Sequence, residues 1–545
     1  MKSSLRILCV LSLSLIACTD KKEIAEEQRI FLTPETMCGT VQFTDGCGKE
    51  QDVLIRFGIA LLHHMTYEDA AYTFDQVIKK DPDCFWGPWG KAMSFLHPMW
   101  PDAPSENEMD LGYVLSQRAL SLAKKDKEKL YGAALAAFYE KSGKNKSERM
   151  ADMQQGWAMA TAQLPDDPEA ALFNGLLRLA LVSPADKTFA VQKEVGAMAE
   201  GLLAKYPDHP GAFHYAIHAY DVPPLAEKAL FVARNYGKVA PEIPHALHMP
   251  SHIFTRLGYW QESIDWNARS CKAASRLPVE NKTSSHYFHA LDYMVYGLLQ
   301  YGEDDEVKTL QHTMDTLSAL PQPTPAAAYA LAAIPSRIPL ETHDWKAATQ
   351  IADPDTSRFP WKKFPQYEAL VYFAKGMGHA RSGHADEAQL YMNKINSLQH
   401  NLGNSPQAKY WNDQMEAQKG CLAAWQELAK GNSAEALQRM TAAADLEDAT
   451  QKNPVSPGSL LPARELLGDM LMELNQPREA LAAYEKSLET NPNRYNTYYG
   501  AGMAAEKMKD VQKAKSYYAK LIALKGEAPS KRESLVHAHK IVDAS

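Results

Sequence analysis

The sequence predicts an all-α fold, an α-solenoid in which antiparallel helix pairs stack into a superhelix. From about Val53 onward, apolar residues follow the period of helices joined by short turns, and the alternation typical of strands is almost absent. Similar residues also recur 34 positions apart in two regions of the chain. The recurring pairs are Pro207 and Pro241, His214 and His248, His218 and His252, Gly468 and Gly502, Ala480 and Ala514, and Tyr484 and Tyr518.

Residues 1–17 predict a targeting segment rather than part of the fold. Lys2 and Arg6 precede a short apolar run that leads into Leu-Ile-Ala-Cys, ending at Cys18. This pattern resembles the lipobox of bacterial lipoproteins, which implies cleavage before Cys18 and lipidation of that cysteine, with placement in the cell envelope. Thr19 follows, without the aspartate that retains such proteins in the inner membrane, so for a bacterium with two membranes the resemblance implies the outer membrane. The alternative is an ordinary secretory signal with a chance cysteine.

Residues 18–52 read as a lipid-anchored tether and N-terminal segment. In an oxidising envelope, Cys38 and Cys47 could form a disulfide that closes a small loop, or both could remain free thiols. The other cysteines are isolated in the sequence, and we expect them to be buried apolar fillers. These are Cys84, Cys271 and Cys421.

The C-terminal region, residues 460–545, contains the most regular repeats and a terminal helix. A small glycine and alanine suit a close helix crossing, a tyrosine fills the space beside them, and Pro492 ends the second helix. These two copies resemble the tetratricopeptide repeat. Residues 449–459 predict a linker, and residues 53–448 a divergent array of similar helix pairs. In the repeat family, the first helix of each pair lines the concave inner wall.

Three neighbouring copies place histidines on one face of their first helices. The predicted stripes are His214, His218 and Asp221; His245, His248 and His252; and His286 and His289 with Asp292 and Tyr296. If the copies keep their register, the stripes lie side by side, because packed helices are about 8–10 Å apart. The segments around them resemble a group of bacterial tetratricopeptide proteins of uncharacterised role, and this resemblance covers most of Val53–Gln350.

These features favour a lipid-anchored binding or scaffold protein that holds a peptide, a partner protein or a small ligand in a histidine-rich concave groove. The expected groove residues are His214, His218, Asp221, His245, His248, His252, His289, Asp292, Tyr296 and Arg337. The net charge of −8 and the lack of a basic stripe disfavour a nucleic-acid partner.

The alternative is a metalloprotein or metalloenzyme. Imidazole and carboxylate ligands suit a divalent transition metal, and two histidines one turn apart form a two-point ligand on a helix. The expected metal ligands are His214, His218, His248 and His252. A third reading is a purely structural hydrogen-bond network. Because the sequence has no G-x-S-x-G, P-loop or H-E-x-x-H motif, it favours a non-enzymatic role; an enzyme of this sequence would be metal-dependent.

The stretch Cys84–Trp100 is rich in aromatic residues. We expect these side chains to form the apolar plug of the N-terminal cap, since aromatic residues are more often core than site. The alternative is an aromatic wall beside the groove.

Overall fold

The computed structural model describes residues 32–43, 46–100, 102–183, 186–279, 281–403, 406–450, 455–525 and 531–544. Within these ranges the chain consists of helices and loops, with two isolated β-bridges, so the all-α prediction is confirmed. The expected lipobox and its Cys18 lie outside the described residues. None of the described helices is both long and apolar enough to cross a membrane.

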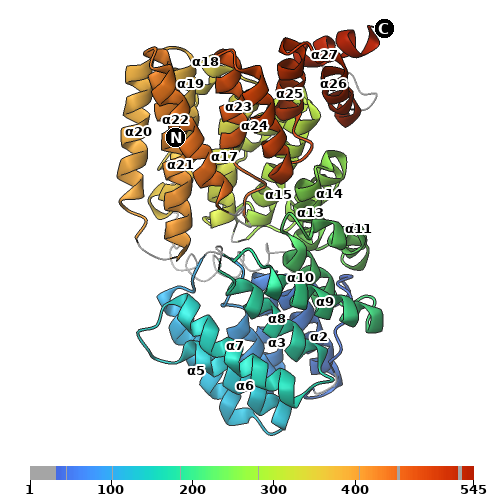
Figure 1. The fold of residues 1–545 in the computed structure, drawn as a ribbon. Coiled ribbons are helices and arrows are strands. Elements are labelled where there is room, and N and C mark those ends of the chain that lie inside the picture. The colour runs from blue at the N-terminus through green and yellow to red at the C-terminus, as the bar shows by residue number, and fades with distance from the viewer. Residues whose placement is uncertain are drawn as a thin grey trace, which may run out of the picture.

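Four antiparallel helix pairs form the N-terminal lobe, at the bottom of Figure 1. They are α2 (Lys49–His63) with α3 (Tyr67–Lys80), α4 (Trp86–Met93) with α5 (Glu106–Leu122), α6 (Asp126–Tyr139) with α7 (Lys146–Gln163), and α8 (Pro168–Ala180) with α9 (Ala190–Lys205). Trp86, Trp89 and Trp157 are fully buried in the core of this lobe. The plug expected from the aromatic stretch is therefore present for Trp86 and Trp89.

Three central pairs connect this lobe to the C-terminal one. They are α10 (Pro210–Tyr220) with η1 (Ala226–Ala229) and α11 (Leu230–Val239), α12 (Pro244–His248) and α13 (Pro250–Leu257) with α14 (Trp260–Ala274), and α15 (Ser285–Tyr301) with α16 (Asp304–Asp315). The first helix of the middle pair is split, because Pro250 has no N–H with which to continue the helical ladder.

The C-terminal lobe continues the array, at the top of Figure 1. Its elements are α17 (Pro325–Glu341) with α18 (Trp345–Thr349), η2 (Trp361–Lys363), α19 (Pro365–Arg381) with α20 (Ala385–Gln399), α21 (Pro406–Ala429) with α22 (Ser433–Asp448), α23 (Ala463–Glu473) with α24 (Pro477–Thr490), α25 (Tyr495–Lys507) with α26 (Val511–Lys525), and α27 (Glu533–Asp543). Added Cβ atoms at Gly468 and Gly502 would overlap the rings of Tyr484 and Tyr518. This confirms the predicted role of the small residues at the helix crossings.

The array closes back on itself, so that its last repeats pack against its central ones. The indole N–H of Trp260 donates to the carbonyl of Asn493 at 2.6 Å. Arg494 is fully buried, donates to the hydroxyl of Tyr296, and forms ion pairs with Glu341 and Glu465. A buried ion network of this kind is costly to break, because each charge left behind lacks a partner. Side chains of the chain itself therefore fill the space where the last repeats meet the central ones.

Part of the expected linker is buried against α15 and α17. Ser456 and Gly458 are buried, and their carbonyls accept hydrogen bonds from Tyr293 and Tyr329 respectively. Arg337 donates to the carbonyls of Gly458 and Ser459.

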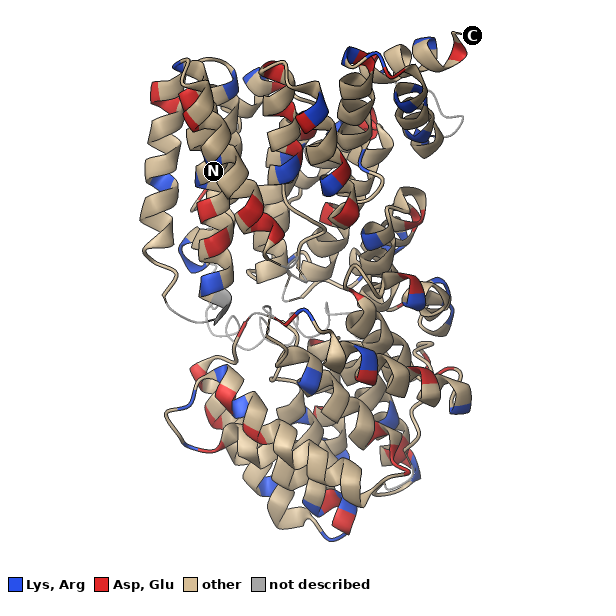
Figure 2. Ribbon diagram, viewed as in Figure 1, with Lys and Arg blue, Asp and Glu red and all other residues tan. Residues whose placement is uncertain are grey.

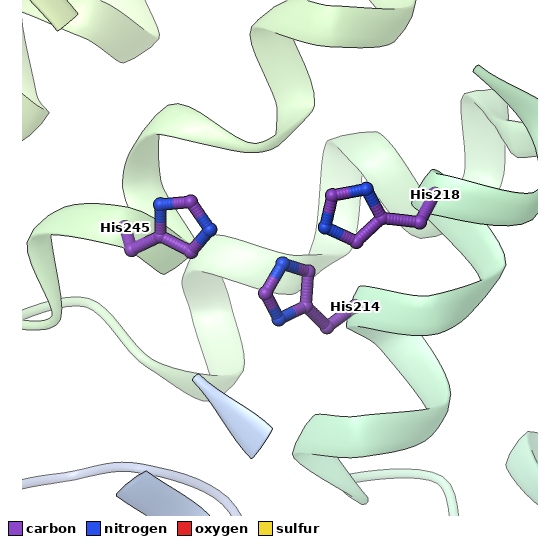
Figure 3. A group of neighbouring side chains, drawn as sticks. All are labelled: His214, His218 and His245. Carbon is purple, nitrogen blue, oxygen red and sulfur yellow. The ribbon is translucent and has the colours of Figure 1, made fainter. Parts of the chain in front are cut away.

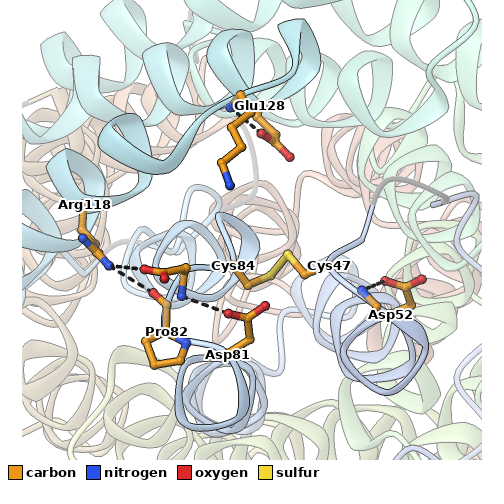
Figure 4. The surroundings of a disulfide bond; sticks show 10 residues. Cys47, Asp52, Asp81, Pro82, Cys84, Arg118 and Glu128 are labelled. Carbon is orange, nitrogen blue, oxygen red and sulfur yellow. Dashed lines mark hydrogen bonds and ion pairs between the residues drawn. A yellow bond between two sulfur atoms is a disulfide. The ribbon is translucent and has the colours of Figure 1, made fainter.

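The cysteine pairing differs from both alternatives drawn from the sequence. A disulfide joins Cys47, just before α2, to Cys84, between α3 and α4 (Figure 4). The proposed Cys38–Cys47 bond is therefore wrong, as is the expectation that Cys84 is only an apolar filler. Cys38 is a buried free thiol, because Thr40 ties its segment to Asp208 and His64 bonds its carbonyl.

Charged residues are dispersed over the helices of both lobes. Figure 2 shows lysine and arginine intermixed with aspartate and glutamate, with no continuous basic stripe on the face in view.

Candidate functional site

Three neighbouring first helices bring seven histidines together at the junction of the two lobes. Helix α10 carries His214 and His218, α12 and α13 carry His245, His248 and His252, and α15 carries His286 and His289. This arrangement agrees with the side-by-side stripes predicted from the 34-residue register.

The structure arranges six of these side chains as two groups of three. The first histidine group is His214, His218 and His245, and the second histidine group is His248, His252 and His289. Within each group, one ring nitrogen per residue lies within 4.8 Å of the others. Figure 3 shows the first group, in which two imidazoles from α10 face a third from across the site. The four ligands expected from the sequence are thus divided between the groups, and each pair gains a third histidine.

The two groups are contiguous. The ring centroids of His245 and His248 are 6.1 Å apart, and those of His218 and His252 are 6.3 Å apart. His286 lies beside the first group, with its ring centroid 5.3 Å from that of His245. The groups therefore form one histidine-lined centre rather than two separate sites.

Hydrogen bonds at Nδ1 determine how three of the imidazoles point. His214 Nδ1 donates to the backbone carbonyl of His63 at 2.6 Å. His252 Nδ1 donates to the carboxylate of Asp221 at 3.0 Å. A backbone carbonyl and an ionised carboxylate can accept a hydrogen bond but cannot donate one. In both histidines Nδ1 therefore carries the proton and Nε2 keeps its lone pair. Such outer contacts are the usual way in which proteins orient metal-binding histidines.

His248 is oriented in the same way by Asn267. The side-chain Nδ2 of Asn267 donates to the carbonyl of Ser263 at 2.7 Å, which turns Oδ1 toward His248. His248 Nδ1 then donates to that oxygen at 2.7 Å. As a result, the Nε2 atoms of His248 and His252, both unprotonated in the neutral rings, face each other at 3.0 Å. Two lone pairs at this distance repel unless a proton or a metal cation lies with them.

The centre is shielded from solvent. His214, His245, His248, His252 and His289 are at most 4% exposed, and His218 is half-buried. Burial, reinforced by neighbouring histidines, lowers the pKa of His214 and of His245 well below the ordinary value. Neutral imidazole is the form that binds a metal.

Several buried nitrogens in the centre lack a hydrogen-bond partner among the residues that the structure describes. They are Nε2 of His214, both ring nitrogens of His245 and Nδ1 of His286. Leaving a buried polar atom unsatisfied costs about 1–3 kcal/mol. Such a concentration indicates that a bound species belongs among these rings.

Trp100 covers one side of the centre. Its ring centroid lies 5.5, 6.3 and 5.8 Å from those of His245, His286 and His289 respectively. Lys146 holds this segment in place by donating to the carbonyls of His97, Trp100 and Asp102. Trp100 therefore lies beside the histidines, whereas Trp86 and Trp89 are in the apolar plug.

The other expected groove residues lie next to the second histidine group or beyond it. Asp221 receives hydrogen bonds from His252 and from Arg256 and so supports the centre from outside. Asp292 and Arg337 are a buried pair with Oδ1 and Nε 3.7 Å apart. Burial raises the pKa of Asp292 to about 6, against the opposing effect of Arg337. The hydroxyl of Tyr296 is engaged by Arg494.

A second buried cluster, which the sequence reasoning missed, supports the first group from behind. Glu169 on α8 accepts hydrogen bonds from His63 at 2.6 Å and His209 at 3.0 Å. Burial alone would raise the pKa of Glu169, but the two histidines hold it well below its usual range. His63 Nδ1 is also bonded to Tyr215. These contacts hold the His63 carbonyl, the acceptor for His214, in place.

Comparison with known proteins identifies a repeat family in the C-terminal region. Residues 461–494 and 495–527 match the model of the tetratricopeptide repeat. This agrees with the resemblance drawn from the regular C-terminal copies and suggests a protein-binding scaffold. No curated protein matches the sequence as a relative.

Several solved structures share a weak likeness over most of the chain. The crystal structure of the APC/C hetero-tetramer Cut9-Hcn1 is 13% identical and covers 90% of this chain and 96% of that one, with a TM-score of 0.29. Yeast Tom70 is 11% identical, with 91% and 95% covered and a TM-score of 0.30. Naa15/Naa10 bound to HypK-THB is 12% identical, with 87% and 76% covered and a TM-score of 0.23. At this level the likenesses carry no conclusion about what this chain binds.

Proposed function

We propose that this protein is a metal-binding helical-repeat protein whose two histidine groups each hold one transition-metal ion. The observation that carries the proposal is the orientation of His214, His248 and His252 by acceptors at Nδ1, which leaves Nε2 of each unprotonated and turned into the centre. Three histidines per ion is a ligand set typical of sites that keep an open position for a water or substrate.

A bound metal ion accounts for two features of the histidines that neither a structural hydrogen-bond network nor an open peptide groove explains. A structural hydrogen-bond network would give the buried ring nitrogens of His214 and His245 hydrogen-bond partners. Nε2 of His214 and both ring nitrogens of His245 have no such partner among the described residues. An open groove for a peptide would expose the imidazoles, whereas those of both groups are buried or half-buried. A cation shared by three lone pairs satisfies each group at once.

A cavity beside the centre favours a second function, the binding of a small ligand. It has a volume of about 300 Å³, and its lining includes Arg256, Trp260, Tyr296 and Tyr329. Arg256 contacts Asp221, and Asp221 orients His252, so two residues would connect an occupant of the cavity to the metal ligands. The tryptophan fluorescence of the protein should change on binding such a ligand, and Trp260→Phe and Trp411→Phe should each reduce that change, because both indoles line the cavity.

The lipid anchor at Cys18 and the outer-membrane location remain part of this proposal. The Cys47–Cys84 disulfide supports an exported protein, because disulfides persist in oxidising compartments.

Metal analysis of the full-length chain, purified without a histidine tag, tests the metal sites. We expect two equivalents in the wild type and about one in His245→Ala and in His289→Ala, each of which removes one ligand of one group. The control His312→Ala changes an exposed histidine on α16 and should retain two. Circular dichroism verifies that each variant is folded. A folded wild type that takes up no transition metal when supplied in excess contradicts the proposal.

A further inference from the structure

We propose that the two histidine groups hold a pair of copper ions, bound by imidazole alone and most stable in the monovalent state. This inference rests on the proposed metal site and identifies its metal. It follows from the absence of charge in the ligand set, from the burial of the centre and from the closeness of the two groups.

Neither histidine group contains an acidic or sulfur ligand among the described residues. The nearby carboxylate of Asp221 is committed to His252 and Arg256, outside the ring of ligand nitrogens. Asp292 faces Arg337 and belongs to neither group. Six imidazoles would therefore hold the two ions. Imidazole suits copper, zinc, iron and nickel, whereas magnesium, calcium and manganese prefer oxygen ligands.

The charge of the bound ions favours copper over the other metals that bind imidazole. Two divalent ions bring a total charge of about +4 into a buried centre whose ligands offset none of it, and two monovalent ions bring about half as much. The repulsion between the ions scales with the product of their charges, so at equal separation it is about fourfold smaller for the monovalent pair. Burying uncompensated charge is costly in any case. Among the imidazole-binding metals, copper is the one with a stable monovalent state.

The known preferences of paired metal sites agree with this choice. Di-iron and di-manganese centres in helical proteins use glutamates from facing helices to balance the charge of the ions. In this centre α10, α12, α13 and α15 supply histidines instead. Even in the divalent state, copper binds nitrogen ligands more tightly than zinc or the earlier metals of the row.

Competition on the metal-free, untagged full chain tests the inference. The protein is titrated anaerobically with Cu(I) in the presence of bicinchoninate, and separately loaded with zinc before copper is added. We expect the protein to keep two Cu(I) ions per chain in competition with bicinchoninate. In the zinc-loaded protein, two equivalents of Cu(I) should release the bound zinc. X-ray absorption at the copper edge should show nitrogen neighbours without sulfur.

The variants localise the two ions. His245→Ala and His289→Ala should each withhold one Cu(I), whereas His312→Ala should withhold two. If zinc stays bound when copper is added, or Cu(I) passes entirely to bicinchoninate while zinc binds, the copper assignment is overturned and the metal site stands. If neither metal binds the folded wild type, both proposals are overturned.

Discussion

His248 and His252 face each other through their Nε2 atoms at 3.0 Å, and the acceptors Asn267 and Asp221 hold the opposite nitrogen of each ring. The two residues are separated by Pro250, which breaks the helix between α12 and α13. Their geometry is stable only if a proton or a metal cation lies between the two lone pairs, and in the proposed site it is the metal. Perturbing the acceptors should therefore weaken metal binding without removing any ligand.

The first prediction concerns Asn267. Asn267→Leu keeps the number and branching of the side-chain heavy atoms but removes the acceptor, so His248 is no longer held in one tautomer. We expect metal affinity at the second histidine group to fall about 10- to 100-fold, as is typical for lost outer contacts. Asn267→Asp retains an acceptor and should recover part of the affinity. Chelator competition measures the change, and Asn393→Leu, at an exposed position on α20, should have no effect.

The second prediction concerns pH. Burial lowers the pKa of His64 to about 4 and the pKa values of His214 and His245 well below 6.5. Below about pH 6.5 the unfolded chain takes up protons that the folded chain does not, so the free energy of unfolding falls as pH falls. The loss is up to about 1.4 kcal/mol per pH unit for each such histidine.

Urea unfolding of the chelator-treated protein at pH 7.5, 6.5 and 5.5 measures this dependence. His245→Phe, which removes one of the buried titrating groups, should make the dependence shallower. Equal stability of the wild type at all three pH values contradicts the prediction.

The third prediction concerns Glu169, which bridges two buried histidines. Glu169→Ala leaves His63 and His209 without their acceptor, and removing one partner of a buried pair typically costs about 3–5 kcal/mol. Glu194→Ala removes the partner of Arg178 at an exposed position and should cost no more than about 1 kcal/mol. Chemical denaturation of the two variants compares these costs, and similar values would argue against a supporting role for Glu169.

The fourth prediction concerns the Cys47–Cys84 disulfide. Because it closes a loop with a sequence separation of 37, Cys47→Ser should lower the free energy of unfolding by about 2–4 kcal/mol. A reducing agent should lower the melting temperature of the wild type and leave that of Cys47→Ser unchanged. Cys271→Ser, which changes a free thiol, should respond to reduction as the wild type does.

The fifth prediction concerns the lipid anchor. In cells, Cys18→Ser should prevent lipidation and move the protein from the membrane fraction to the soluble fraction. Fractionation followed by immunoblotting measures this. If both forms fractionate alike, the lipobox reading of residues 15–18 is wrong.

The histidine stripes could be predicted from the sequence because repeated helices place the same residue at the same phase. His214 and His248 are 34 positions apart, and this spacing was enough to predict that they lie on neighbouring first helices. The division into two groups could not be predicted. It depends on which imidazoles of α10, α12, α13 and α15 meet across the helices, and the 34-residue register does not determine this.

The contacts that orient the ligands were equally beyond the sequence. The His63 carbonyl is 151 residues from His214, and a backbone atom leaves no pattern in a sequence. Trp100 lies in a loop between α4 and α5, where aromatic content alone cannot separate a core residue from a covering one. The Cys84 pairing was missed for a similar reason, since spacing alone does not determine connectivity.

The closure of the array, through Trp260 and Asn493, changes how the protein should come apart. In an open solenoid each repeat contacts only its neighbours, so unfolding can begin at a free end and spread. Here the contact spans 233 residues, and the terminal repeats cannot detach without breaking the buried ion pairs of Arg494. The C-terminal repeats thus stabilise the central ones through long-range contacts. The central and C-terminal helices should therefore unfold together in one cooperative transition rather than repeat by repeat from the C-terminus.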